Sequence, residues 1–293
     1  MNTLTENPSS LAIAVIFVIL TVLGIITIVA RKQSRAGSYV FYIWLFFLIF
    51  LISDTMPFRL ATWLWGFLSF FILREFFSMI DFRVQDRFGI VAAYISIPFM
   101  MHFIHTDWYN MFIITIPVYS FLVIPFLVAL GGKETEGAIT SIGIIVFGLF
   151  LFVYCIGHIA YLSYYNLWMA VMLILNIAIC DISVFVAGSR MKPSVKGRFI
   201  TYFCQIPFTV SLTFICATWC GISHVHSISL GLLIPALIMI GNYTIQYIEA
   251  DLGIFRENLR PGKGLIIENI KSILYAAPVV FHYFRYFMGE QIS

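Results

Sequence analysis

Long apolar segments, separated by short polar ones, constrain this chain more than any other feature of its sequence. A helix of roughly 20 apolar residues crosses the hydrocarbon core of a bilayer. Of the 293 residues, 61% are hydrophobic and 11% are charged, against about 45–50% and about 25% in soluble domains. The runs do not alternate as barrel strands do. We therefore predict an all-α fold, a polytopic integral membrane helical bundle with about nine or ten transmembrane helices.

The apolar runs also set the predicted boundaries of the spans. A polar N-terminal tail, residues 1–10, precedes a single transmembrane domain, residues 11–293. Two runs, Tyr39–Ser53 and Ile273–Met288, are short for a full crossing, so a re-entrant or interfacial helix is open for each. In chain order the predicted spans are Leu11–Ala30, Tyr39–Ser53, Leu60–Ile80, Phe88–His105, Trp108–Leu130, Ile139–Leu162, Leu167–Gly188, Phe199–Ile222, Ile228–Ile248 and Ile273–Met288.

Basic residues collect in alternate loops between these spans, whereas the opposite loops keep only Arg59. Cytoplasmic loops of membrane proteins carry an excess of Lys and Arg. We therefore predict an N-terminus outside the cell and basic loops in the cytoplasm, in a bacterial-type inner (plasma) membrane. The tail lacks the basic residues of a secretory signal peptide, so we expect the first span to be retained. The basic residues are Arg31, Lys32, Arg35, Arg83, Arg87, Lys133, Arg190, Lys192, Lys196, Arg198, Arg256, Arg260, Lys263 and Lys271.

Two groups of polar residues lie inside or at the end of predicted spans. Asp181 stands in an apolar stretch, residues 172–187, where an ionisable group costs at least about 2.5–3.5 kcal/mol to insert. We expect it to face a protein interior or a wet cavity, either as a functional group or as a hydrogen-bonding group that packs its helix; Asn176 lies off the same face. Arg74 and Glu75 are adjacent, so they cannot pair on one helix and each needs a partner elsewhere.

A short basic loop, residues 189–198, follows the span that contains Asp181. Its cations have two interpretations. They are explained by membrane topology alone, or they attract an anionic lipid headgroup or a nucleotide phosphate beside Asp181.

The segment Gly241–Ser272 is the longest informative polar stretch. Asn242 and Gln246 lie four residues apart, on one face of a helix, and Glu249 and Asp251 follow at the inner boundary. The turn residues 261–264 then return the chain to the membrane, because Pro and Gly interrupt helices. This pattern is typical of a loop that forms a site.

At this segment the chain resembles the phosphatidate cytidylyltransferase (CDP-diglyceride synthetase) family of integral membrane enzymes. The similarity is weak over most of the chain and best over its last fifty residues. Upstream, Asp181, Gly188 and the helix end at Arg74-Glu75-Phe76 also match. The C-terminal positions in register are Gly241, Asp251, Leu252, Gly253, Ile254, Pro261, Gly262, Gly264, Ser272, Ala277 and Pro278.

Several signature positions carry a different residue here. A family aspartate is Asn242, a serine is Gln246, and a Lys-Arg pair is Glu249-Ala250. A histidine is Lys263, a glycine is Leu265, an Asp-Arg pair is Glu268-Asn269, and a second aspartate is Lys271. The basic loop is also shorter, with Lys192-Pro193-Ser194 and Lys196 as its counterpart. These changes reverse or remove charges around one small site.

The resemblance implies transfer of a cytidylyl group from CTP to phosphatidate, which gives CDP-diacylglycerol and pyrophosphate in phospholipid biosynthesis. It implies a site within residues 176–272, with Asp181 and Glu268 as catalytic residues and Mg²⁺ held by Asp181, Asn242 and Glu268. It also implies that the substrate phosphates are bound by Lys192, Ser194, Lys196, Arg198 and Lys263.

The expected partners are therefore a phospholipid and CTP and no nucleic acid, with a homodimer left open. The alternative is a catalytically impaired relative that binds lipid or a partner protein. A small-solute transporter is a third alternative, motivated by Asp181 and Asn176, but no inverted repeat supports it.

Overall fold

The computed structural model describes residues 8–29, 35–132, 135–188, 195–253 and 264–292. Within these ranges every element is helical and no strand occurs. Ten helical stretches of the described chain are long and apolar enough to cross a membrane. The predicted fold class, an all-α polytopic membrane bundle, is confirmed.

The two short predicted spans are longer in the structure. They become Gly37–Thr55 and Leu265–Met288, of 19 and 24 residues, which is enough for a crossing. The last helix begins at Leu265, eight residues before the apolar run. Glu268, Asn269 and Lys271 lower the hydropathy of its first two turns but are compatible with a helix. The hydropathy pattern therefore placed the start of this helix too late.

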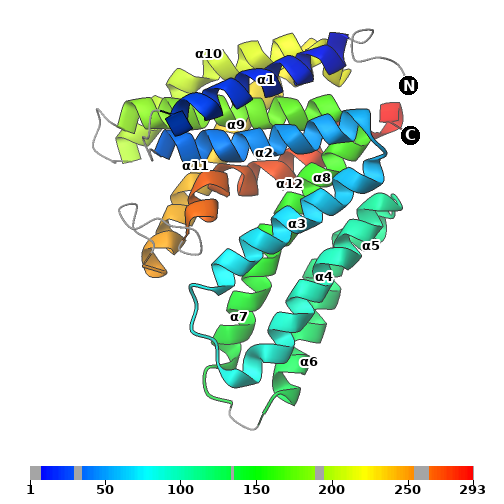
Figure 1. Cartoon of the computed structure of the whole chain (residues 1–293), viewed down its shortest axis with the longest axis vertical. Coiled ribbons are helices and arrows are strands. Elements are labelled where there is room, and N and C mark those ends of the chain that lie inside the picture. The colour runs from blue at the N-terminus through cyan, green and yellow to red at the C-terminus, as the bar shows by residue number, and fades with distance from the viewer. Residues whose placement is uncertain (1–7, 30–34, 133–134, 189–194, 254–263, 293) are drawn as a thin grey trace. The chain divides into compact units, whose positions relative to one another are not determined.

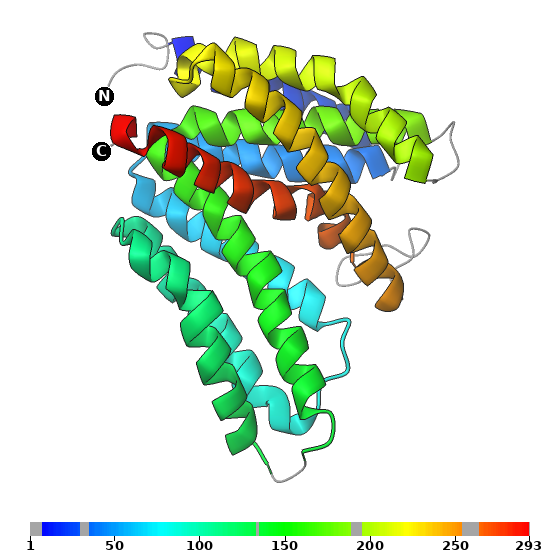
Figure 2. The same cartoon turned by 180° about the vertical axis from the view of Figure 1, so that it is seen from behind.

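The chain divides into two compact units, and the prediction of one transmembrane domain over residues 11–293 stays a prediction. Unit 1 comprises residues 1–57, 162–246 and 269–293. In unit 1, α1 (Pro8–Val29) packs against α2 (Arg35–Thr55), α2 packs against α9 (Leu167–Gly188), and α9 packs against α10 (Val195–Cys220). Figure 1 shows these four helices running alongside one another. Seen from behind, α10 again runs alongside α9 (Figure 2).

Two further helices, α11 (His224–Asp251) and α12 (Leu265–Ile292), contribute most of their length to unit 1. Small residues let their backbones approach neighbours closely, as is usual between membrane helices. A Cβ at Gly231 would lie 2.6 Å from Cα of Val210 in α10, and one at Gly241 would lie 2.9 Å from Cβ of Tyr275 in α12. Gly241 therefore allows the end of α11 to reach the start of α12.

Hydroxyl and amide side chains join the helices of unit 1 at the same contacts. Thr209 Oγ1 donates to the carbonyl of Gly231 at 2.7 Å, and Thr213 Oγ1 donates to that of Ser227 at 2.8 Å. Gln205 Nε2 donates to the carbonyl of Cys180 at 3.0 Å. These bonds hold α10 against α11 and α9.

Unit 2 comprises residues 58–161 and 247–268. Helix α4 packs against α3, α6 and α7. The π-helical segments η2 and η3 lie within long helical stretches, and η2 contains Pro117, which lacks the N–H that an α-helix needs. The elements are α3 (Phe58–Phe77), η1 (Val84–Asp86), α4 (Arg87–His105), α5 (Tyr109–Ile114), η2 (Thr115–Ser120), α6 (Phe121–Leu130), α7 (Ala138–Leu149), η3 (Phe150–Tyr154) and α8 (Cys155–Tyr165), which ends in unit 1.

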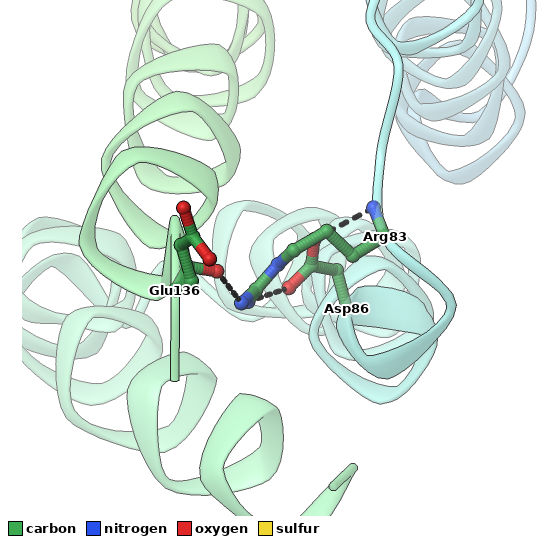
Figure 3. Close-up of polar contacts among 3 residues, drawn as sticks. All are labelled: Arg83, Asp86 and Glu136. Atoms are coloured by element: carbon green, nitrogen blue, oxygen red, sulfur yellow. Dashed lines mark hydrogen bonds and ion pairs between the residues drawn. The ribbon is translucent and has the colours of Figure 1, made fainter. Parts of the chain in front are cut away.

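Arg83, one of the basic loop residues, has a structural role in unit 2. Its guanidinium forms an ion pair of 2.6 Å with Asp86, which is fully buried, and it donates to the backbone carbonyl of Glu136 (Figure 3). The loop after α3 is thereby tied to the loop before α7. The positive charge of Arg83 therefore neutralises the buried Asp86 within unit 2.

Candidate functional site

The carboxylate of Asp181 is the centre of a polar cluster in unit 1. Tyr39 Oη donates to its Oδ2 at 2.9 Å, and Ser272 Oγ donates to its Oδ1 at 2.5 Å. The three residues come from α2, α9 and α12, and 142 residues of chain separate Tyr39 from Asp181. Asp181 thus contacts polar groups from two other helices, as expected for an ionisable group in a span that faces either a protein interior or a wet cavity.

Ser272 also links Asp181 to Asn242, at the end of α11. Its Oγ lies 3.0 Å from the side-chain oxygen position of Asn242. One hydroxyl has one proton, so it cannot donate to both neighbours. An ionised Asp181 only accepts, so Ser272 donates its proton to Asp181 and accepts a hydrogen bond from Asn242. The amide of Asn242 then turns its NH₂ toward Ser272, because amide orientation is assigned from the hydrogen-bond network. The chain of donors then runs from Asn242 through Ser272 to Asp181.

Lys271 directly precedes Ser272 on α12 and is only 6% exposed. We call Tyr39, Asp181, Asn242 and Ser272 the Asp181 cluster.

The alternating direction in which successive helices cross the membrane explains why these residues meet. Tyr39 is near the start of α2 and Asp181 near the end of α9, while Asn242 is near the end of α11 and Ser272 near the start of α12. Helices that cross in turn place the start of one beside the end of the next. The whole cluster therefore lies at one end of unit 1.

The other predicted site residues belong to unit 2, to the start of α10 or to the part of the chain outside the described residues. Glu268 stands in the first turn of α12, in the part that belongs to unit 2. Lys196 and Arg198 stand in the first turn of α10. Lys192, Ser194 and Lys263 lie outside the described residues. Of the predicted metal ligands, the structure thus joins Asp181 to Asn242.

Glu75 finds the separate partner that the sequence required, within unit 2. Its Oε2 accepts a hydrogen bond of 2.8 Å from the backbone N–H of Ile266, in the first turn of α12. Gly264 precedes this turn at φ 82°, a conformation that glycine adopts at little cost. A carboxylate is stabilised at a helix N-terminus. The buried Glu75 therefore caps the start of the last helix.

The described part of the Asp181 cluster fits a resident Mg²⁺ poorly. Its oxygens are the right ligand type, but Asp181 supplies the only carboxylate among the four residues, and both of its oxygens accept hydroxyl protons. Across the described residues no group of three His, Cys, Asp or Glu side chains is arranged to hold a metal. The four residues alone therefore lack the carboxylates that a resident Mg²⁺ requires.

Sequence reasoning identified Asp181 and Asn242 but missed Tyr39 and the burial of Lys271. A tyrosine near the end of a span is ordinary at a membrane interface, so its position carried no signal. Lys271 had a signal, a cation at a position where the resembling family has an acid. Its burial depends on tertiary packing.

These features define a class of protein: a polytopic helical membrane protein whose late helices gather polar residues around a carboxylate. The cytidylyltransferase family model matches residues 33–287. The chain belongs to the cytidylyltransferase family, so the resemblance seen in the sequence is confirmed.

An uncharacterised protein of Escherichia coli K12, YnbB, is 22% identical, over 94% of this chain and 98% of its own length. No solved structure shows a significant match.

Proposed function

We propose that this protein binds an anionic phospholipid and a cytidine nucleotide at the Asp181 cluster, and that it transfers a cytidylyl group from CTP to phosphatidate. The observation that carries the proposal is the cluster itself. It joins Asp181, Asn242 and Ser272, three positions in register with the resembling family and far apart in the sequence.

The reaction depends more on cations that stabilise the phosphates than on a general base, because the attacking phosphate is already ionised. A phosphate oxygen of phosphatidate, already ionised, attacks the α-phosphorus of CTP. A P–O bond forms there, the bond to the bridging oxygen of the β-phosphate breaks, and pyrophosphate leaves. Catalysis of such transfers consists mainly of positioning and of stabilising negative charge. We assign Lys192, Ser194, Lys196, Arg198 and Lys263 to the substrate phosphates. Magnesium enters only as the counter-ion that the nucleotide carries.

We further propose that the cluster lies at the cytoplasmic face of an inner membrane. The basic loops after α9 and α11 follow the helix ends that carry Asp181 and Asn242. The excess of Lys and Arg on that side supports a cytoplasmic location.

The second candidate is a relative that binds the same ligands without turnover. The specific observation in its favour is a loss of negative charge, because Asn242 and Lys271 stand at positions that are acidic in the resembling family.

One assay separates the two candidates. Purified protein in detergent is incubated with radiolabelled CTP, phosphatidate and Mg²⁺, and CDP-lipid is extracted and counted. Asp181→Asn is the test variant. Asp54→Asn is the matched control, because it makes the same chemical change at an exposed position near the far end of α2.

Product formed by the wild type and by Asp54→Asn, but not by Asp181→Asn, supports the enzyme. Saturable CTP binding without product supports the non-catalytic relative. No binding and no product would refute both.

A further inference from the structure

The carboxylate of Asp181 keeps acceptor capacity beyond the two hydrogen bonds that orient it. An ionised carboxylate has about four acceptor positions. In the described chain, Tyr39 Oη donates to Oδ2 at 2.9 Å and Ser272 Oγ donates to Oδ1 at 2.5 Å. Asp181 is only half-buried, whereas Ser272 is 3% exposed. A ligand can therefore reach a carboxylate that is already held from two sides.

The charge of the cluster decides which part of a ligand fits beside this carboxylate. A carboxylate repels phosphate oxygens and accepts from O–H and N–H donors. The side chains of Tyr39, Asn242 and Ser272 are neutral, so within the cluster they leave that charge uncompensated. Phosphatidate presents a phosphate at its head, whereas CTP also carries ribose hydroxyls and a base amino group. The cluster therefore suits the nucleoside part of CTP.

A hydroxyl matches the cluster better than an amino group does. The side-chain amide of Asn242 has two N–H donors, and the contact of 3.0 Å with Ser272 uses one of them. The cluster thus combines an acceptor, Asp181, with a donor, Asn242. A ribose hydroxyl can donate to the first and accept from the second, while the amino group of cytosine can only donate.

A resident divalent metal ion is the other kind of ligand that a carboxylate attracts. It fits this cluster less well, because Asp181 is the only carboxylate of the four residues. In addition, Tyr39 and Ser272 direct hydroxyl protons at both of its oxygens. A neutral hydroxyl needs only one acceptor position and no further negative charge.

We propose that Asp181 binds a ribose hydroxyl of the cytidine nucleotide and thereby selects ribonucleotides, with Tyr39 and Ser272 holding the carboxylate for this contact. Acidic side chains bind ribose hydroxyls in the same way in dinucleotide-binding folds. The inference rests on the proposed function and deepens it, since it names the part of CTP that the Asp181 cluster recognises. It replaces the metal-binding role that the family resemblance implies for Asp181.

The experiment is a thermodynamic cycle between the protein and the nucleotide. Binding of CTP and of 2′,3′-dideoxy-CTP to the purified full-length protein in detergent is measured by calorimetry in excess EDTA. We expect the wild type to bind the dideoxy nucleotide about tenfold or more weakly, because a charged acceptor loses its donor. In Asp181→Asn the two nucleotides should bind within about threefold of each other. The 2′-deoxy and 3′-deoxy nucleotides then identify the hydroxyl.

Asp54→Asn is the matched control, since it makes the same chemical change at an exposed position and should keep the wild-type preference. Adding Mg²⁺ should strengthen both nucleotides and leave their ratio unchanged. If Asp181→Asn does not fold, Ser272→Ala replaces it. This variant keeps the carboxylate and removes one donor that orients it, so the preference for CTP should fall about threefold or more.

Three results would overturn the inference. The first is equal binding of CTP and the dideoxy nucleotide by the wild type, which needs no variant. The second is an equal loss for both nucleotides in Asp181→Asn that occurs only with Mg²⁺, which would assign Asp181 to the metal. The third is a loss in Asp181→Asn that persists for the dideoxy nucleotide but disappears for UTP, which would assign Asp181 to the base.

Failure of the inference and failure of the proposed function give different results. A wild type that binds CTP without any preference for ribose hydroxyls would overturn the inference alone. A wild type that binds no nucleotide, with or without Mg²⁺, would refute the proposed function and the inference with it.

Discussion

Replacing Tyr39 by phenylalanine removes one hydroxyl from the Asp181 cluster and keeps the ring. The lost interaction is the 2.9 Å hydrogen bond to Asp181 Oδ2. Hydrogen bonds to charged groups contribute about 1.5–3 kcal/mol in soluble proteins, whereas those between membrane helices average ~0.6 and reach ~1.7 kcal/mol. The charged acceptor places this bond at the upper end of the membrane range. We therefore expect Tyr39→Phe to lower the free energy of unfolding by about 1–1.7 kcal/mol.

The assay is reversible unfolding of the purified protein in mixed micelles, with denaturing detergent as the titrant. Tyr286→Phe is the matched control, because that ring is 83% exposed on α12 and should change the unfolding free energy by less than about 0.5 kcal/mol. Asp181→Ala removes the acceptor and completes a double-mutant cycle. The reasoning is refuted if Tyr39→Phe costs as much with Asp181→Ala as without it, because the hydroxyl would then act on something other than the carboxylate.

Three further predictions test the fold and the topology. Gly231→Ala should cost about 1–3 kcal/mol of unfolding free energy, because its Cβ would meet the Val210 backbone at 2.6 Å, whereas Gly24→Ala has nothing within 4 Å and should be neutral or stabilising; equal effects in the same titration would contradict the close contact. Arg83→Gln should cost about 3 kcal/mol, since it leaves the fully buried Asp86 without its ion pair; a loss no larger than that of the exposed Arg59→Gln would show that the pair is unimportant. A cysteine at Ser194 should react with impermeant thiol reagents only after the cytoplasmic side is opened, while one at Ser9 should react from outside; labelling of Ser194→Cys in intact cells would reverse the predicted orientation.

Hydropathy predicted the helical architecture because lipid leaves a chain few alternatives. Every backbone group must be satisfied inside the membrane, so long apolar runs become helices. The ends of the helices were less predictable. The apolar run stopped at Ile273, but α12 begins at Leu265, since its first turn is anchored by Glu75, a residue about 190 positions earlier in the chain. A window of local hydropathy contains no information about that partner.

The candidate site was predictable where a single residue carried a physical cost. Asp181 could be singled out because a carboxylate in a span requires partners, and its link to Asn242 and Ser272 agrees with the register of the resemblance. Tyr39 could not be found in this way, since its hydroxyl matters only through the packing of α2 against α9. Lys271 was visible as a substitution, but its burial depends on how α12 is rotated in the bundle.

The two roles that the sequence left open for Asp181, a packing group and a ligand group, are compatible in this arrangement. Tyr39 and Ser272 hold the carboxylate from α2 and α12, which joins three helices and accounts for a structural role. An ionised carboxylate has about four acceptor positions, so two hydroxyl donors fix its orientation without exhausting it.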